Sequence, residues 1–192
     1  MRRGTHGHRG GDRAVVGVIA DTHGLLRPEA LTALSGVDLI VHAGDIGSPA
    51  ILAELGAIAP VIGVRGNNDR EAWAAPIPKI ATTEIAGRRL YVIHDFKMLS
   101  ADPAALGVDV IISGHSHRPS VQHRSSVVLL NPGSAGPRRF SLPIAVARLR
   151  LRPAGPRAEI VELTVARPAR RPPARRRRGL DGARGPGAVS VR

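Results

Sequence analysis

Short runs of aliphatic and β-branched residues alternate along the chain with Ala- and Leu-rich segments that are bounded by Pro, Ser or Gly. Such apolar runs are typical of strands covered on both faces, and the segments between them are typical of short helices. The pattern predicts strands over 14–20, 38–43, 61–65, 89–94, 108–113 and 127–131, and helices over 27–35, 49–56 and 102–107. This alternation indicates an α/β fold.

Two other regions alternate apolar with polar residues. Segments 143–151 and 158–165 do so near the end of the chain, and we expect them to form a paired terminal hairpin in a second sheet. The stretch TTEIAGRRLYVI, residues 82–93, predicts a further hairpin that turns at Gly87.

The charge of the chain lies mostly at its two ends. The 192 residues carry a net charge of +13, which by itself suggests a nucleic-acid-binding protein. Residues 1–13 carry +3 and residues 167–192 carry +8, which leaves +2 on residues 14–166. We therefore expect a disordered extension over 1–13, one domain over 14–166 and a disordered Arg- and Pro-rich tail over 167–192. The tail is either an arm that contacts nucleic acid or another polyanion, or an extension without a role.

Composition also limits the chemistry and the location of the protein. The chain has no cysteine, so a metal ion must be held by histidine, carboxylate or amide groups. No apolar stretch approaches the roughly 20 residues of a membrane span, and the first 13 residues lack the apolar centre of a secretory signal. We expect a cytoplasmic protein that makes no membrane contact.

A polar cluster follows nearly every predicted buried strand at its carboxyl end. The clusters are Asp21-Thr22-His23, Gly44-Asp45, Gly66-Asn67-Asn68-Asp69, His94, Gly114-His115-Ser116-His117 and Asn131-Pro132-Gly133-Ser134. In an open α/β sheet, ligands bind in the crevice beyond the carboxyl ends of the strands. We therefore expect these loops to converge at one sheet edge.

Imidazole, carboxylate and amide groups in these clusters form a ligand set for a divalent metal such as Mn, Fe, Zn, Ni or Co. The candidates are Asp21, His23, Asp45, Asn67, His94, His115 and His117. One ion takes three or four protein groups, so seven candidates fit two ions about 3.5 to 4 Å apart that share a carboxylate. Alone, the D-x-H motif is more typical of a turn or a helix cap than of a metal site. Gathered at one sheet edge without a cation, these side chains would repel one another or lack hydrogen-bond partners.

Other polar residues favour structural roles. We expect His42, within a strand, to be a core residue or to orient a ligand, and His123 to lie on the surface. Residues 131–134 predict a turn that can also line the site, and Trp73 is expected to pack rather than to border a pocket. His6 and His8 lie in a Gly-rich segment, where histidines are either solvated or bind a metal loosely.

The ordered motifs D-x-H, G-D, G-N-x-D, H and G-H-x-H resemble the signature of the calcineurin-like metallophosphoesterases, and within them the small YfcE-like phosphodiesterases. The resemblance covers residues 15–134. It implies a four-layer α/β/β/α sandwich of two mixed sheets, in the α/β (α+β) class. It also implies two divalent ions, with manganese expected first and Ni, Fe, Zn or Co as alternatives. One ion would be held by Asp21, His23, Asp45 and His117, and the other by Asp45, Asn67, His94 and His115.

The chain departs from the family pattern at two positions. Larger members have a histidine after the asparagine of the third motif, where it protonates the leaving group, whereas this chain has Asn68. Many members read Gly-His after the fourth motif, whereas this chain reads Asp95-Phe96. An amide cannot protonate a leaving group at neutral pH, so we expect substrates whose leaving oxygen departs easily without a proton. Asn68 and Asp69 are expected to have supporting roles.

The resemblance implies a phosphodiesterase in which a hydroxide bridging two metal ions attacks phosphorus in line. A small phosphoester is the expected substrate, and an oligomer is compatible with the sequence. The alternative is a catalytically idle scaffold for protein contacts, as in a retromer subunit that has this fold and has lost metal ligands. All seven candidate ligands remain here, which favours the enzyme. A nuclease or nucleic-acid-binding protein is supported by the Arg-rich tail alone.

Overall fold

Two five-stranded sheets make up most of the protein, as seen in a computed structural model that describes residues 12–139 and 141–165. The first sheet has the order β10 (Arg157–Glu162), β9 (Ala145–Leu151), β1 (Ala14–Ile19), β2 (Leu39–His42) and β3 (Val61–Gly63). The second has the order β4 (Ile80–Ile85), β5 (Arg88–Ile93), β6 (Val110–Ile112), β8 (Val127–Asn131) and β7 (Ser120–Arg124). Each sheet contains parallel and antiparallel pairs, so both are mixed.

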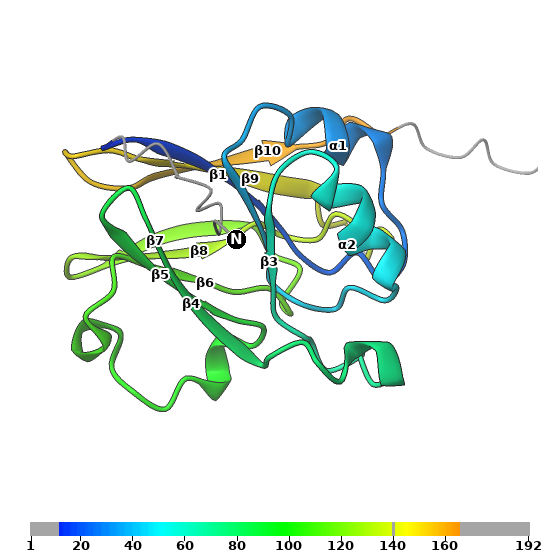
Figure 1. Ribbon diagram of the computed structural model, residues 1–192, viewed down its shortest axis with the longest axis horizontal. Helices are drawn as coiled ribbons and strands as arrows, with labels where there is room; N and C mark the ends of the chain where they lie inside the picture. The colour runs from blue at the N-terminus through cyan, green and yellow to red at the C-terminus, as the bar shows by residue number, and fades with distance from the viewer. Residues whose placement is uncertain (1–11, 140, 166–192) are drawn as a thin grey trace, which may run out of the picture.

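The sheets pack face to face around an aliphatic core (Figure 1). Alternate side chains of each strand point to opposite faces, and Val16 and Val18 of β1 therefore meet Leu90 and Val92 of β5 between the sheets. All four side chains are fully buried. Because β1 is covered on both faces, it carries no polar side chain along its length.

Two α-helices cover the outer face of the first sheet (Figure 1). Helix α1 (Pro28–Ala33) and helix α2 (Pro49–Gly56) both begin with proline, which fits the first helical turn because its missing N–H needs no partner there. Ser48 caps α2 by accepting a hydrogen bond from the N–H of Ala50. None of the helices in the described part of the chain is long and apolar enough to span a membrane.

The outer face of the second sheet is covered by short turns rather than α-helices. Ile93 and Ile111 pack there against Phe96 and Leu106, which belong to the 3₁₀ turns Phe96–Met98 and Pro103–Leu106. The helix expected over 102–107 is thus a single 3₁₀ segment, capped by Asp102 and ended by Gly107 in a left-handed conformation. A third 3₁₀ turn spans Ala72–Ala74. The predicted order of layers, α/β/β/α, is confirmed with this thinner fourth layer.

The terminal hairpin lies in a different sheet from the one expected. Strands β9 and β10 pair with each other as predicted, but β9 pairs antiparallel with β1 and so extends the first sheet. The side chains of β9 are buried at Ala145, Ala147, Leu149 and Leu151, which continue the core between the sheets. The second sheet is instead made by β4, β5, β6, β7 and β8, and the hairpin of β4 and β5 turns at Ala86 and Gly87 as predicted.

Strand β7 was not predicted from the sequence. Its residues SVQHR are polar except Val121, and apart from half-buried Ser120 they are exposed, because β7 is an edge strand of the second sheet. The expectation of a surface position for His123 is confirmed. The sequence offers no apolar run at an edge strand of this kind, so periodicity alone could not detect it.

The parallel strands place their carboxyl ends at one end of the sandwich. Strands β1, β2 and β3 run parallel in the first sheet, and β5, β6 and β8 run parallel in the second. The loops of the two sheets meet through a hydrogen bond of 3.0 Å from the N–H of His115 to Asp21 Oδ2. The polar loops therefore converge where two sheet edges meet, rather than at the edge of one sheet.

Candidate metal centre

The structure brings all seven candidate ligands together from five loops. Backbone hydrogen bonds join these loops directly: Asp21 N donates to Gly44 O, His23 N to Asp45 O, and Gly114 N to His94 O, each at 2.9 Å. The first two bonds tie the loop after β1 to the loop after β2, and the third ties the loop after β6 to the end of β5. The backbone of the strand ends therefore fixes the positions from which the polar side chains project.

One group of donor atoms is formed by Asp21, His23 and His117, whose candidate ligand atoms all lie within 4.8 Å of one another. The Nε2 atoms of His23 and His117 face each other at 3.5 Å, and His117 Nε2 lies 3.3 Å from Asp21 Oδ1. The two imidazole rings are stacked, with centroids 5.4 Å apart. Two ring nitrogens and a carboxylate oxygen thus point at a common centre.

The second group is formed by Asp45, Asn67, His94 and His115. Asn67 Oδ1 lies 3.1 Å from His94 Nε2 and 3.0 Å from His115 Nδ1. The donor atoms of Asp21, Asp45 and His94 also lie within 4.8 Å of one another, so the two groups are contiguous.

Asp45 lies between the two groups. Its Oδ2 atom is 3.9 Å from His23 Nε2 and 3.5 Å from His94 Nε2. Burial would raise the pKa of Asp45, but hydrogen bonds from His94 and from the backbone and side chain of Asn68 outweigh it and hold the pKa well below its usual range. Asp45 is therefore an anion at neutral pH and can face both groups at once.

His94 directs its Nε2 atom at two oxygen atoms. Its Nδ1–H donates to the carbonyl of Ala43 at 2.7 Å, which fixes the ring so that Nε2 faces Asn67 Oδ1 and Asp45. Burial would lower the pKa of His94, but the hydrogen bonds to Asp45 and Ala43 raise it above its ordinary value. Because Nε2 faces the amide oxygen of Asn67 and the carboxylate of Asp45, either a proton or a metal ion must lie between this nitrogen and the two oxygens.

A buried carboxylate oxygen shows that the residues fit a cation. Among the described residues, Asp21 Oδ1 is buried and has no hydrogen-bond partner. A buried carboxylate oxygen without a partner is costly, and a divalent ion satisfies it. The donor set of imidazole, carboxylate and amide oxygen matches borderline and hard divalent metals.

The backbone at these positions is strained. Seven non-glycine residues of the described chain have a positive φ, and five of them are candidate ligands: Asp21 at 54°, His23 at 47°, Asp45 at 53°, His115 at 66° and His117 at 56°. A left-handed conformation costs a residue with a Cβ on the order of 1 kcal/mol, and such strain concentrates at functional sites. The fold therefore holds these side chains in orientations that an ordinary turn does not require.

Close approach of the loops depends on Gly66. A Cβ atom there would lie 2.1 Å from Asp45 Oδ1 and 2.3 Å from Asp45 N, so only glycine fits beside this carboxylate. Asp69 closes the same region by accepting hydrogen bonds from the N–H groups of Gly66, Gly47 and Ile46 at 2.8, 2.9 and 3.1 Å.

Asn68 and Asp69, predicted as supporting residues, contact protein groups rather than open space. Asn68 Nδ2 donates to Asp45 Oδ2 at 2.7 Å and Asn68 N donates to Asp45 Oδ1 at 2.9 Å. Asp69 is buried and its carboxylate is used by backbone groups. Asn68 therefore orients Asp45, and Asp69 holds two loops in place.

His42 is a core residue, as the sequence predicts. It is fully buried, and burial lowers its pKa from 6.5 to about 4, so the ring is neutral at pH 7. His42 Nδ1 accepts from Gly44 N at 3.2 Å, and because Thr22 Oγ1 donates to the carbonyl of Ile46, His42 Nε2 donates to that hydroxyl at 2.9 Å. This network supports the loops that carry Asp21, His23 and Asp45.

The turn over residues 131–134 supports the site from the other sheet. Ser134 Oγ donates to the carbonyl of Asp21 at 2.9 Å, and Asn131 Nδ2 donates to the carbonyl of Gly114 at 2.6 Å. Trp73 packs against the apolar cluster beside the helices, as expected.

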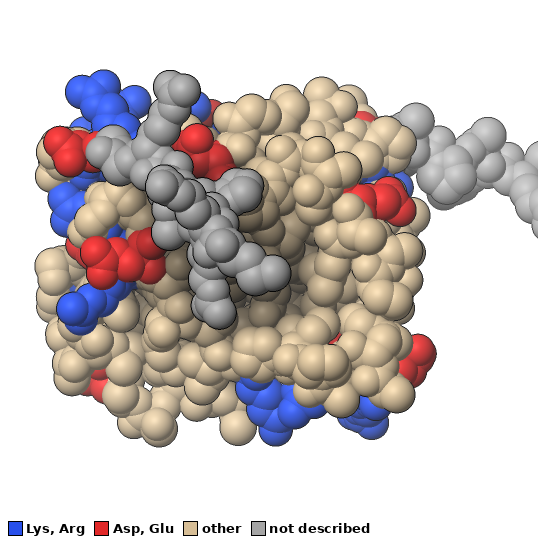
Figure 2. All heavy atoms as spheres, viewed as in Figure 1, with Lys and Arg blue, Asp and Glu red and all other residues tan. Residues whose placement is uncertain are grey.

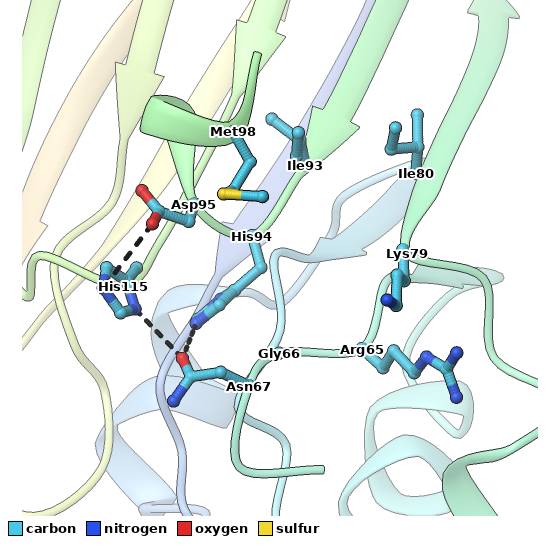
Figure 3. A pocket seen from close by; sticks show the side chains of 10 residues that line it. All are labelled: Arg65, Gly66, Asn67, Lys79, Ile80, Ile93, His94, Asp95, Met98 and His115. Carbon is cyan, nitrogen blue, oxygen red and sulfur yellow. Dashed lines mark hydrogen bonds and ion pairs between the residues drawn. The ribbon is translucent and has the colours of Figure 1, made fainter. Parts of the chain in front are cut away.

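A pocket of about 420 Å³ opens beside the second group (Figure 3). Asn67, His94 and His115 lie at one side of it, and Ile80, Ile93 and Met98 form an apolar wall. The remaining lining residues are Arg65, Gly66, Lys79 and Asp95. Apart from Asp95, which the sequence marks as a departure from the family pattern, the residues outside the motifs were not singled out from the sequence. Their only signal was proximity to a strand end, as for Arg65 directly before Gly66.

The chain belongs to the calcineurin-like phosphoesterase superfamily, whose domain it matches over residues 15–153. It is 43% identical over 132 residues to a protein named "Probable metallophosphoesterase" from Methanothermobacter thermautotrophicus, a match that covers 62% of this chain and 76% of the relative. The predicted family is thus confirmed, and with it a metallophosphoesterase that uses divalent metal.

Solved structures share the fold at lower identity. A novel archaeal phosphodiesterase is 23% identical with a TM-score of 0.60, covering 77% of this chain and 99% of the other. Vps29 from Entamoeba histolytica, solved in complex with Zn²⁺, is 21% identical with a TM-score of 0.58, covering 77% and 98%. These likenesses confirm the fold.

Proposed function

We propose that this protein is a binuclear metal-dependent phosphodiesterase. One observation carries the proposal: Asp45 Oδ2 lies between two contiguous groups of donor atoms, 3.9 Å from His23 Nε2 and 3.5 Å from His94 Nε2. A carboxylate in this position is suited to bridge two cations, and the partnerless Asp21 Oδ1 gives one of those cations an anionic ligand.

Each proposed ion has four protein ligands. Asp21, His23, Asp45 and His117 would hold the first, and Asp45, Asn67, His94 and His115 the second. When bound, two divalent ions would supply positive charge at the phosphoryl oxygens and would lower the pKa of a bound water toward neutrality. Manganese is the first metal to test, with Ni, Fe, Zn and Co as alternatives.

The protein residues supply orientation. Asn68 fixes both oxygens of Asp45, and the carbonyl of Ala43 fixes the His94 ring with Nε2 toward the centre. The position after Asn67 bears an amide that cannot protonate a leaving group, so substrates with a stable leaving anion are favoured. Aryl phosphodiesters have such leaving groups.

The second candidate is a scaffold without catalytic activity, since Vps29 has the same fold. The complete set of seven candidate ligands and the backbone strain at five of them favour the enzyme, because a scaffold has no use for that strain.

A role in binding nucleic acid through residues 167–192 stays a prediction, because this segment lies outside the described residues. Figure 2 shows acidic and basic side chains interspersed around the visible face, which offers no continuous basic surface in its described part.

The test is hydrolysis of bis(4-nitrophenyl) phosphate by metal-stripped protein with and without added Mn²⁺. We expect turnover only with metal, and its loss in Asp45→Asn and His115→Ala. His123→Ala is the matched control, because His123 is an exposed histidine on β7 away from the site. Equal turnover in the stripped protein, or in either ligand variant, would contradict the proposal.

A further inference from the structure

We infer that the pocket beside the second metal group selects diesters whose retained organic group is apolar and carries a second negative charge. The inference rests on the proposed function, because the scissile phosphate must lie against Asn67, His94 and His115, which form one side of the pocket. It concerns the part of the substrate that stays on phosphorus after the leaving group departs.

The apolar wall is unusual in its exposure. Ile80 is 46% exposed and Met98 is 73% exposed, and these are two of the four large apolar side chains that are exposed in the described part of the chain. Both line the same pocket, next to buried Ile93, which pairs with Ile80 across β4 and β5. Exposed apolar side chains that gather in a pocket indicate a surface that is covered by a ligand.

The charges in the pocket are separated. Figure 3 places Arg65 and Lys79 on the side away from His115, with Ile80 next to Lys79 and the apolar wall running along the top of the view, and Asp95 on the same side as His115. Asp95 Oδ2 lies 3.8 Å from His115 Nε2. Among the residues that the structure describes, neither Arg65 nor Lys79 has a carboxylate within 4.0 Å.

A backbone hydrogen bond joins the two segments that carry these cations. The N–H of Arg65 donates to the carbonyl of Pro78 at 2.9 Å, which joins the segment after β3 to the residue that precedes Lys79. Two neighbouring cations without a protein anion repel each other, and a ligand anion relieves that repulsion. Asp95 disfavours an anion at the opposite side, so the second negative charge of the substrate belongs at Arg65 and Lys79.

A substrate of this class spans the pocket in one orientation. Its scissile phosphate lies at the histidines, its apolar body lies along Ile93, Met98 and Ile80, and its second anion reaches Arg65 and Lys79. In the reaction, a water oxygen forms a bond to phosphorus and the water gives up a proton to solvent, while the bond to the leaving oxygen breaks and its electron pair departs with the alkoxide or phenoxide. The retained group leaves as a phosphomonoester that still carries its second anion.

Two diesters with the same leaving group test the inference. They are 4-nitrophenyl phenyl phosphate and 4-nitrophenyl 4-carboxyphenyl phosphate, which differ in one carboxylate on the retained ring. With Mn²⁺ bound, we expect the wild-type protein to have a KM about tenfold lower for the carboxylated diester, the effect of one charge-assisted hydrogen bond. The release of 4-nitrophenolate measures both reactions.

The double variant Arg65→Gln, Lys79→Gln tests the assignment of the second anion. We expect the ratio of the two KM values to fall to about one. Lys97→Gln is the matched control, because Lys97 is an exposed lysine beside Met98 that does not line the pocket, and the ratio should persist there. Met98→Gln is expected to raise KM for both diesters by a similar factor, because the apolar wall contacts the ring that they share.

Three results would overturn the inference. Equal KM values for the two diesters in the wild type would do so and would leave the proposed phosphodiesterase intact. An unchanged ratio in the double variant would also do so: with unchanged KM values it would assign the selectivity to other residues, and with both KM values raised equally it would assign Arg65 and Lys79 to the scissile phosphate. Absence of hydrolysis of either diester would remove the proposed function together with the inference.

Discussion

Replacing Gly66 with alanine tests whether the position of Asp45 determines metal binding. The added Cβ would lie 2.1 Å from Asp45 Oδ1, whereas ordinary contact begins at 3.4 Å, so the carboxylate must move by about 1 Å. Metal–ligand distances tolerate changes of only about 0.2 Å. A displacement of this size removes Asp45 from the ligand set and breaks its hydrogen bonds from Asn68 N and Nδ2.

The expected result is a loss of Mn²⁺ affinity of about 100-fold or more, with a parallel loss of diester hydrolysis. Calorimetric titration of metal-stripped protein measures the affinity. Gly56→Ala is the matched control, because Gly56 is the last residue of α2 and a Cβ there would meet nothing within 4 Å. The control should keep wild-type affinity and be as stable as the wild type or slightly more so. Wild-type affinity for Mn²⁺ in Gly66→Ala, with the fold intact by circular dichroism, would show that metal binding does not depend on the position of Asp45.

Three further predictions concern groups around the ligands. Asn68→Ala removes the 2.7 Å bond to Asp45 Oδ2 but keeps the backbone bond to Oδ1, so Mn²⁺ affinity measured by titration should fall by about tenfold and not vanish. Asp69→Ala leaves three backbone N–H groups without their partner, which should lower the free energy of unfolding by about 3 kcal/mol in urea denaturation; a loss under 1 kcal/mol would argue against this role. His42 has a pKa of about 4 when folded and about 6.5 when unfolded, so the unfolded state binds the proton first as pH falls. Stability should therefore be complete above pH 6.5 and decrease between pH 6.5 and 4 by up to about 3 kcal/mol, and the part of the loss due to this ring should be absent in His42→Gln.

Much of the fold could be predicted because buried strands appear in the sequence as continuous apolar runs. The strands ending before Asp21 and Asp45 follow this rule, and their carboxyl ends located the polar loops correctly. The partition of strands between sheets could not be predicted in the same way. Pairing of β9 with β1 joins Leu149 to Val16, which are far apart in the chain, and no local pattern specifies such a partner.

The candidate ligands could be predicted because their motifs combine spacing with residue type. The wall of the pocket could not, because its composition depends on tertiary packing. Ile80 reaches the site through its pairing with Ile93, and Met98 through a 3₁₀ turn that packs on the outer face of the second sheet. Neither residue carries a chemical signature in the sequence. The positive φ angles of Asp21 and His115 were likewise visible only in the structure.

We propose that two cations hold these seven side chains together, and anomalous diffraction at the manganese edge from crystals grown with Mn²⁺ is the decisive measurement. We expect two peaks about 3.5 to 4 Å apart, with Asp45 in contact with both. A map without a peak among these residues, or with a single peak that Asp45 does not contact, would contradict it.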